Sequence, residues 1–431
     1  MAGQTNLKSP VVWGAHASAC RHRLLCRPLH QLGLVQETSQ GIHVDAEELG
    51  GESASQMIAA TACLRPLFLV CWLARFSTVM AQDLGVILPA VEPLWDKSLE
   101  VHAGVGYTDN VLLASVAKQS SSFTVLGADA ALFRVAATGP EFSLFLSGED
   151  RRFSRSVGVD HDESWIAIGK LRQEFPGQTE AALSLQYLYQ DQVFDISATE
   201  TNLLSIQLRG HGLKGTPSVG FAFWEKYRIR LEWPISRQYL AKPLDDYWET
   251  GLRLTLEWNY GHRSSLSASS TYFGRQYDTR PQSARDGSPI AGTELHLQRH
   301  DLEVAQRHYW DAARRWRSDT KLGVEINRDP GSGYFSYDRF RISEQIRYAE
   351  GKWSLQAGAR LSFYGYSIQR ADPPEASQRH LLTLSITVRG EVRIRSKVKG
   401  FLDIVTDQNY SNRAANEYQA LTISGGVNWE L

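Results

Sequence analysis

From residue 97 to residue 431, apolar and polar side chains alternate with a period of two residues. The clearest segment has one apolar face, formed by Trp248, Thr250, Leu252, Leu254, Leu256 and Trp258, and one polar face, formed by Glu249, Gly251, Arg253, Thr255 and Glu257. Successive side chains of a β-strand point to opposite sides, so this pattern is typical of strands with one apolar face. No 3.6-residue pattern of helical length follows residue 81. The sequence therefore predicts an all-β fold.

The length of the alternating segments distinguishes a membrane barrel from a soluble sandwich. Strands of soluble proteins usually run about five or six residues. These segments keep their phase for about 9 to 13 residues, as a tilted strand that crosses a bilayer does. Trp248 and Trp258 lie at the two ends of one apolar face, and a strand tilted by about 40° places them about 25 Å apart across the membrane. We therefore predict a transmembrane β-barrel.

Turn signals divide this region into sixteen predicted strands. They are residues 98–107, 122–137, 141–150, 163–175, 179–191, 201–212, 218–233, 247–259, 264–275, 293–308, 314–327, 338–348, 352–367, 380–389, 392–406 and 416–431. Long polar loops alternate with tight turns, as in an up-and-down antiparallel barrel with short periplasmic turns. No proline lies inside a predicted strand, in keeping with its missing N–H. Residues 213–233, where Trp224, Glu225 and Lys226 could form a turn, and residues 389–400, where the pairing is vague, are the least defined, so 14 or 18 strands are the alternatives.

Sulfur-containing residues mark a boundary in the chain, because all four cysteines and all three methionines precede residue 82. Residues 57–81 have an apolar core at 67–73 and end in small residues, which predicts a secretory signal peptide cut after Ala81. A short buried helix is the alternative. We interpret residues 1–56 as a non-native extension or a disordered leader. The mature chain would then have a periplasmic segment at 82–96 and a barrel at 97–431.

The polar faces of the predicted strands would line the lumen if the apolar faces contact lipid. These predicted lumen residues are Arg228, Arg230, Glu232, Arg253, Glu257, Arg317, Asp319, Lys321, Glu325, Arg339, Arg341, Arg360, Arg393 and Arg395. Such a wall either attracts anionic solutes or pairs its charges between neighbouring strands. Pairing is favoured because the charges after residue 81 nearly balance. Six of the 46 basic and five of the 47 acidic residues precede residue 82, so 40 basic and 42 acidic residues remain. The predicted membrane-interface aromatics are Trp248, Trp258, Trp316, Trp353, Phe363 and Trp429.

Other chemistry finds little support in the sequence. The formal net charge of −1 lacks the positive field of a nucleic-acid-binding protein, so we expect no nucleic-acid partner. No nucleophile elbow, acid–base pair or phosphate-binding loop stands out, and we expect no catalytic residue, cofactor or metal. Residues 160–163 have ligands for a divalent cation, although a surface acidic cluster is the favoured interpretation. His296, His300 and His308 share one strand face, for which a lumen-facing role is plausible.

Three features resemble bacterial outer-membrane β-barrel proteins: the signal sequence, the alternating strands with aromatic ends, and a C-terminal strand with Trp429 and Leu431. In that class the barrel-assembly machinery reads the last strand, which usually ends in Phe where this chain has Leu431. Residues 104–111 also resemble the first hairpin of poorly characterised barrels found beside exopolysaccharide and surface-protein export genes. The resemblance implies a location in the cell outer membrane of a Gram-negative bacterium, with lipid, lipopolysaccharide, the assembly machinery and export systems as partners.

The leading functional prediction is a porin-like pore or export conduit for polar solutes or polysaccharide, because about sixteen strands normally enclose an aqueous channel. The longest external loop, residues 276–292, is the candidate constriction, and a solvated loop is the alternative. A non-conducting anchor or assembly partner for surface material is the second hypothesis. An outer-membrane hydrolase is the third, and we expect no enzymatic activity.

Overall fold

The computed structural model describes residues 94–135, 139–155, 158–195, 205–224, 226–242, 244–261, 263–371 and 377–431. All of these residues belong to one compact unit of the chain. The predicted extension (1–56), the predicted signal peptide (57–81) and most of the predicted periplasmic segment (82–96) lie outside the described residues. The first strand begins at Leu94, slightly before the predicted start of the barrel.

Strands make up most of the described chain. Their bounds are β1 Leu94–Thr108, β2 Ser121–Val135, β3 Glu141–Phe153, β4 His161–Phe175, β5 Thr179–Asp195, β6 Ser205–Phe223, β7 Tyr227–Glu232, β8 Ile235–Leu240, β9 Tyr247–Tyr260, β10 Ser264–Tyr277, β11 His296–Tyr309, β12 Trp316–Arg328, β13 Tyr337–Glu350, β14 Trp353–Arg370, β15 Gln378–Arg395, β16 Val398–Ser411 and β17 Tyr418–Glu430. A short 3₁₀-helix, η4 Ala414–Asn416, precedes β17. No helix in this part of the chain has the length and apolarity to cross a membrane.

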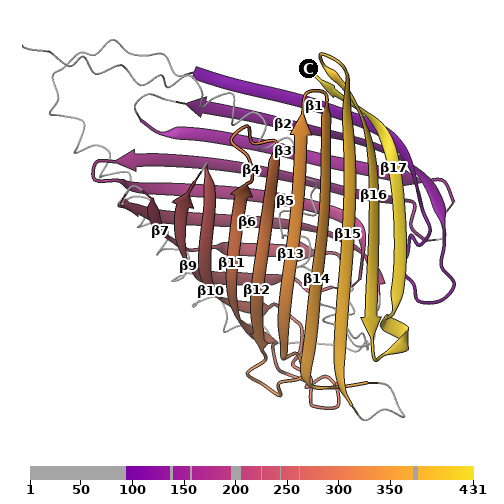
Figure 1. The fold of residues 1–431 in the computed structure, drawn as a ribbon. Coiled ribbons are helices and arrows are strands. Elements are labelled where there is room, and N and C mark those ends of the chain that lie inside the picture. The colour runs from indigo at the N-terminus through magenta and orange to yellow at the C-terminus, as the bar shows by residue number, and fades with distance from the viewer. Residues whose placement is uncertain are drawn as a thin grey trace, which may run out of the picture. The chain divides into compact units, whose positions relative to one another are not determined.

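Hydrogen bonding closes the strands into a barrel. The pairing is antiparallel between strands that follow each other around the sheet, and β1 pairs with β17 from Glu100↔Glu430 to Thr108↔Thr422. β7 and β8 are two halves of one barrel strand, because both pair with β6 and with β9. The described strands therefore form a closed barrel of sixteen antiparallel strands (Figure 1). This confirms the predicted all-β, up-and-down architecture.

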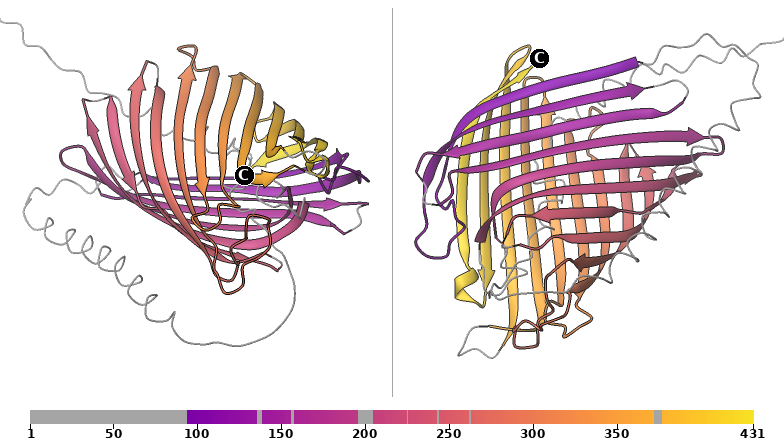
Figure 2. Two further views of the ribbon diagram at one scale, coloured as in Figure 1. Left: turned by 90° about the horizontal axis from the view of Figure 1, so that it is seen from below. Right: turned by 180° about the vertical axis from the view of Figure 1, so that it is seen from behind.

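The strands are strongly inclined around the barrel, as closure of a twisted sheet requires. β2 to β6 on one wall cross the direction of β12 to β15 on the opposite wall at a steep angle (Figure 2). The short turns and the start of β1 lie at one end of the barrel, which we call the turn end. The longer connections lie at the other end, which we call the loop end.

The predicted turn at residues 213–217 is wrong. β6 runs continuously through Pro217 to Phe223, and β7 begins at Tyr227, so the connection lies at the alternative position that the sequence also offered. Pro217 is tolerated because it faces the gap between β7 and β8, at Trp233 and Pro234, where no regular ladder needs its missing N–H. Both prolines take part in the sheet only as hydrogen-bond acceptors. Trp233 N donates to Pro217 O, and Gly251 N donates to Pro234 O, both at 3.0 Å. The predicted loop at residues 234–246 is also wrong in its first half, because the strand resumes after this gap as β8, which occupies Ile235–Leu240.

The predicted boundary between residues 389 and 392 is also misplaced. β15 continues to Arg395, and the turn to β16 lies at Ser396 and Lys397. The register of β15 against β16 shifts between Arg393 and Arg395, which interrupts the regular alternation on which the sequence prediction depends.

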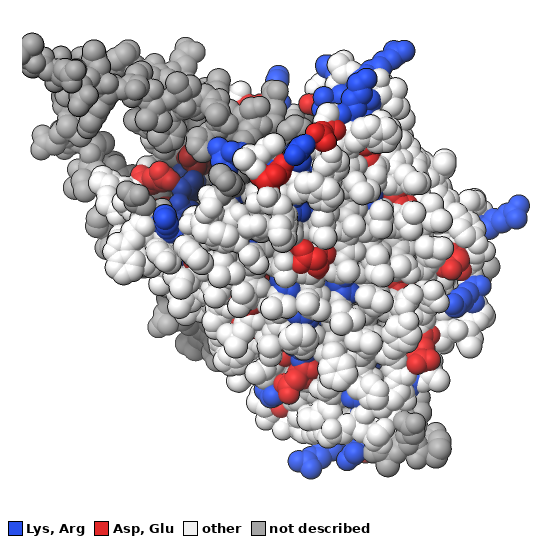
Figure 3. Space-filling model, viewed as in Figure 1, with Lys and Arg blue, Asp and Glu red and all other residues white. Residues whose placement is uncertain are grey.

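The two sides of the barrel wall differ in composition. On β9, Leu252, Leu254 and Leu256 are exposed on the outside, whereas Glu249 is buried on the inside. The same outward apolar face continues on the neighbouring strands, and a space-filling view shows a mainly uncharged outer surface with separate, scattered charged groups (Figure 3). An apolar outside around a polar inside is the arrangement of a membrane-spanning barrel.

Candidate pore lumen

The barrel encloses a cavity of about 760 Å³ whose wall is predominantly polar. The wall carries twelve carboxylates, namely Glu100, Asp129, Glu149, Glu180, Glu232, Asp301, Glu303, Asp319, Glu344, Glu391, Asp403 and Asp407. It carries eleven Lys and Arg side chains, namely Arg151, Lys170, Lys214, Arg230, Arg253, Arg307, Lys321, Arg339, Arg341, Arg360 and Arg389. The charged groups of the described wall are thus nearly balanced in number.

Arg341 on β13 is the centre of one group of paired charges. Its guanidinium lies 2.7 Å from Asp301 on β11, 3.2 Å from Glu303 and 3.5 Å from Glu325. Glu325 also lies 3.6 Å from Arg339, and it accepts a hydrogen bond of 2.7 Å from the Tyr337 hydroxyl. These contacts join β11, β12 and β13 across the inside of the wall. They are the interstrand ladders that the sequence analysis favoured over a free basic strip.

Glu180 on β5 is the centre of a second group near the turn end. Three guanidinium groups surround its carboxylate: Arg172 at 2.9 Å, Arg228 at 3.6 Å and Arg230 at 3.1 Å. The Glu180 side chain is only 9% exposed, whereas each arginine is roughly a quarter to a third exposed. A single buried anion therefore neutralises a basic part of the wall.

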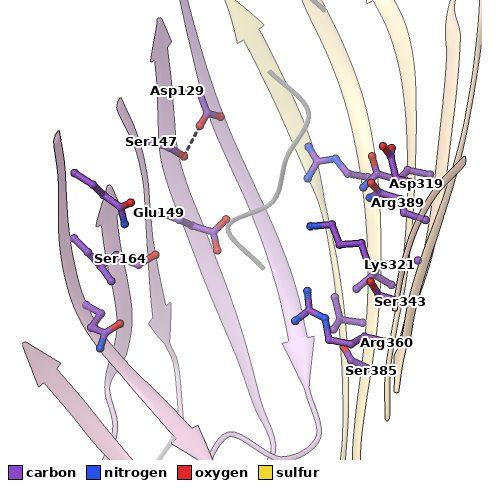
Figure 4. A pocket seen from close by; sticks show the side chains of 18 of the residues that line it. Asp129, Ser147, Glu149, Ser164, Asp319, Lys321, Ser343, Arg360, Ser385 and Arg389 are labelled. Carbon is purple, nitrogen blue, oxygen red and sulfur yellow. Dashed lines mark hydrogen bonds between the residues drawn. The ribbon is translucent and has the colours of Figure 1, made fainter. Parts of the chain in front are cut away.

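Uncharged side chains share the wall with these ion pairs. Ser, Thr and Gln residues line the cavity on β4 to β6 and on β13 to β15: Ser164, Ser184, Gln186, Gln190, Gln192, Thr216, Ser218, Ser343, Gln345, Ser354, Gln356, Ser385 and Thr387. Asp129 and Glu149 project into the cavity opposite Lys321, Arg360 and Arg389 (Figure 4). Hydroxyl and amide groups donate and accept hydrogen bonds without attracting one sign of charge.

The structure places eight of the fourteen predicted lumen residues in the cavity wall: Arg230, Glu232, Arg253, Asp319, Lys321, Arg339, Arg341 and Arg360. Four others lie beside that wall: Arg228 against Glu180, Arg317 against Asp319 at 2.7 Å, Glu257 across from Arg228, and Glu325 against Arg341. Arg393 and Arg395 do not line the cavity, because they lie at the exposed end of β15.

Sequence reasoning missed most of the acidic partners, including Glu180 and Asp301. The signal for Glu180 was present, because Leu183, Leu185 and Tyr187 define the outward face of β5 and leave even-numbered residues inside. Spacing within one strand does not show which residues of the next strand lie opposite, so the ion pairs themselves were not predictable in this way.

All six predicted interface aromatics lie on the outer face and are exposed: Trp248, Trp258, Trp316, Trp353, Phe363 and Trp429. Trp258, Trp316, Trp353 and Trp429 lie near strand ends at the turn end, and Trp248 lies at the loop end. Trp316 contacts Tyr348 with ring centroids 4.6 Å apart. Their role at a membrane interface stays a prediction.

A hydrophobic cluster fills the loop end on the side from β5 to β14, and we call it the loop-end cap. Its buried members are Leu208, Leu240, Leu244, Tyr247, Tyr277, Leu295, Leu297, Tyr334 and Phe335, with Phe194 and Ile368 packed against them. The loops at 278–295 and 329–336 approach closely: a Cβ at Gly287, whose φ is +90°, would lie 2.7 Å from the Tyr334 hydroxyl. Arg280 is buried between the rings of Tyr277 and Phe335, at 5.3 and 4.5 Å.

The predicted cation and histidine features do not form a site. Asp160 and His161 are hydrogen-bonded at 2.6 Å, and this bond lowers the pKa of Asp160. In the part of the chain that the structure describes, no three His, Cys, Asp or Glu residues form a set that could hold a metal ion. The lumen-facing role considered for the histidines of β11 is wrong, because His300 lies on the outer face with Leu302 and contacts Tyr272 at 4.7 Å.

The fold and the cavity define a closed, membrane-type β-barrel with a polar lumen. No family model matches the chain, and no curated protein matches it. Solved structures similar to it include OccAB1 of Acinetobacter baumannii (9% identity, 78% of this chain and 97% of that chain, TM-score 0.42) and OccK9 of Pseudomonas aeruginosa (12%, 78% and 99%, 0.41). Another is an anion-selective porin from Comamonas acidovorans (10%, 79% and 100%, 0.39). The fold of this chain rests on its own strand pairing, and no function is transferred from similarities of this size.

Proposed function

We propose that this chain is a barrel of the bacterial outer membrane that forms a water-filled pore for polar solutes. One observation carries the proposal: a cavity of about 760 Å³ with a charged and hydrogen-bonding wall lies inside a closed barrel whose outside is apolar. Water and polar solutes are stable beside such a wall, and hydrocarbon is stable against the outer face. The proposed location also makes outer-membrane lipid, lipopolysaccharide and the barrel-assembly machinery its proposed partners.

The balance of charges in the lumen favours weak ion selectivity. Twelve carboxylates face eleven Lys and Arg side chains, and many of them are within 4 Å of an opposite charge. Paired charges attract a passing ion less than an unpaired ring of one sign does. The Ser, Thr and Gln residues between them suit uncharged hydroxylated solutes, so passage of neutral saccharides, including an exported polysaccharide, is the finer form of this proposal.

The loop-end cap favours a second candidate function. Its apolar cluster joins the inner faces of strands from β5 to β14, and such a plug would obstruct ions on that side of the barrel. A barrel closed in this way would serve as a non-conducting anchor or assembly partner for surface material. The two candidates differ in whether current passes through the purified, folded protein.

Planar-bilayer recording separates these candidates. We expect discrete ion-sized conductance steps for the wild type and larger steps for a variant in which residues 278–295, which include the cap member Leu295 and the buried Arg280, are replaced by a short Gly-Ser linker. A matched control shortens the β1–β2 loop at residues 113–118 and should keep the wild-type conductance. If neither the wild type nor the cap variant conducts, while heat-modifiable gel mobility shows that both are folded, the pore is refuted and the anchor is supported.

A further inference from the structure

Three turns at the turn end form one continuous edge of the barrel. They lie at residues 310–315, 351–352 and 396–397. Backbone hydrogen bonds join each to the strand beside it: Ala349 N donates to Arg315 O (2.9 Å), Arg393 N to Lys352 O (2.8 Å), and Glu430 N to Lys397 O (2.8 Å). Side chains on these turns are therefore held next to one another.

This edge carries an excess of positive charge. Arg315 is neutralised by Asp311 at 2.8 Å and by Glu350 at 2.9 Å. Five further basic side chains are exposed, and within the described residues none of them makes an ion pair with a carboxylate: Arg314, Lys352, Arg393, Arg395 and Lys397. We call these five residues the basic rim. Glu430 and the C-terminal carboxylate of Leu431 lie at the same edge, and Glu391 is paired with Arg389 at 2.9 Å, so five basic groups face two carboxylates that these ion pairs do not use. Lys and Arg gather along the upper edge near β15 and β16 in Figure 3.

Large apolar side chains lie on the outer face of the same edge, beside Arg395. Arg395 pairs with Val398, which pairs with the outward Trp429, whereas Arg393 pairs with Lys399 on the inner face. Trp353, Ile394 and Trp429 are 65%, 59% and 57% exposed. Trp353 lies opposite Val392, and Trp429 lies opposite Val398, so the three apolar side chains flank the tip of the β15–β16 hairpin. Aromatic rings with one polar end prefer the boundary between hydrocarbon and head groups. The long stems of Arg and Lys lie on apolar surface while their charged ends reach polar surroundings.

The turns of the turn end differ in how their basic groups are neutralised. At the β4–β5 turn, residues 176–178, the flanking Arg172 is surrounded by Glu141, Glu174 and Glu180. Acidic groups therefore neutralise the basic charge there, whereas the basic rim retains it. A surface whose only role was solvation would not require this concentration of positive charge beside exposed tryptophan.

We propose that the basic rim binds the head groups of anionic phospholipids in the leaflet at the turn end. The phosphate of phosphatidylglycerol would accept hydrogen bonds from Arg395 and Lys397, and its acyl chains would lie against Trp353 and Trp429. The arrangement combines charge complementarity with an apolar surface at head-group depth. The inference rests on the proposed membrane location, but it is independent of whether the lumen conducts.

Native mass spectrometry of the intact, folded protein tests the inference. The protein is incubated in detergent with equal amounts of phosphatidylglycerol and phosphatidylethanolamine, and bound lipids are counted. The test variant is R393Q/R395Q/K397Q. The control, K118Q/K242Q/R285Q, removes the same charge from exposed loop-end positions. Heat-modifiable gel mobility confirms that each protein is folded, and bilayer conductance is recorded for the same preparations.

The wild type and the loop-end control should retain phosphatidylglycerol over phosphatidylethanolamine by about ten-fold, and the rim variant should lose most of that preference. Equal retention of the two lipids by the wild type, or an unchanged preference in the rim variant, overturns the inference. Capture of soluble poly-glutamate by the wild type without a preference for phosphatidylglycerol also overturns it, in favour of an acidic polymer as partner. A wild type that conducts normally but shows no lipid preference overturns this inference and leaves the pore supported, whereas a wild type that prefers phosphatidylglycerol but does not conduct has the opposite meaning.

Discussion

Replacing Glu180 by glutamine should destabilise the barrel measurably, because one buried carboxylate holds three guanidinium groups. The substitution keeps the shape of the side chain but leaves Arg172, Arg228 and Arg230 without the anion that lies 2.9, 3.6 and 3.1 Å from them. Breaking a fully buried pair costs about 3 to 5 kcal/mol, whereas an exposed pair contributes about 0 to 1 kcal/mol. The arginines are partly exposed, so we expect a loss of about 2 kcal/mol in the free energy of unfolding.

Guanidinium unfolding of the protein in lipid vesicles, followed by tryptophan fluorescence, measures this loss. Glu174 provides a matched control, because it pairs with the same Arg172 but is 64% exposed. E174Q should lose less than about 0.5 kcal/mol. The same E180Q protein should also shift its reversal potential toward anions, since Arg228 and Arg230 lose the carboxylate beside them, while Arg172 keeps Glu141 and Glu174. Equal unfolding midpoints for E180Q and E174Q, with unchanged selectivity, would refute the reasoning.

Three further changes test other parts of the structure. At the β1–β17 seam a Cβ on Gly426 would lie 2.1 Å from Ala103 O, so G426A should fail to give the compact heat-modifiable species, whereas G390A, with nothing within 4 Å, should fold normally. Leu295→Ala removes a fully buried side chain from the loop-end cap and should lower the unfolding free energy by about 2 to 5 kcal/mol; an unchanged unfolding curve would show that the cap is not packed as described. The hydrogen bond from Arg315 lowers the pKa of Asp311. The ionised Asp311 side chain therefore stabilises the folded protein at pH values above the ordinary aspartate pKa, and this stabilisation is lost as the pH falls through the lowered pKa. Wild type should therefore be more stable than D311N at pH 7, with the difference disappearing in acid; a difference independent of pH would contradict the assignment.

The strands and their faces were largely predictable from sequence, because each depends on a local pattern. On β9 the alternation from Trp248 to Trp258 specifies a strand, its apolar side and its length together. Lipid outside and water inside impose this alternation along the spanning strands. Fourteen of the predicted segments overlap a single observed strand without a change of order, and the errors are concentrated where the alternation is interrupted.

The remaining features depend on contacts between distant parts of the chain. Pro217 predicted a turn because its missing N–H is unfavourable within a sheet, but the gap at Pro234 on the next strand removes that cost. The loop-end cap was not predictable because Leu295 and Phe335 meet only after the barrel forms. The ion pairs around Glu180 likewise need the register of β4, β5 and β7, which the sequence of one strand does not contain.

The pairing of β1 with β17 has a consequence for the order of folding. Glu100 and Glu430 are partners although 330 positions separate them, so the last ladder forms only after nearly the whole barrel sequence is available. Before that step, two strand edges present unpaired N–H and C=O groups, which are costly in hydrocarbon and open to pairing with other chains. A partly synthesised barrel is therefore an aggregation-prone intermediate. Productive insertion requires that both edges stay covered until β17 displaces whatever covers them.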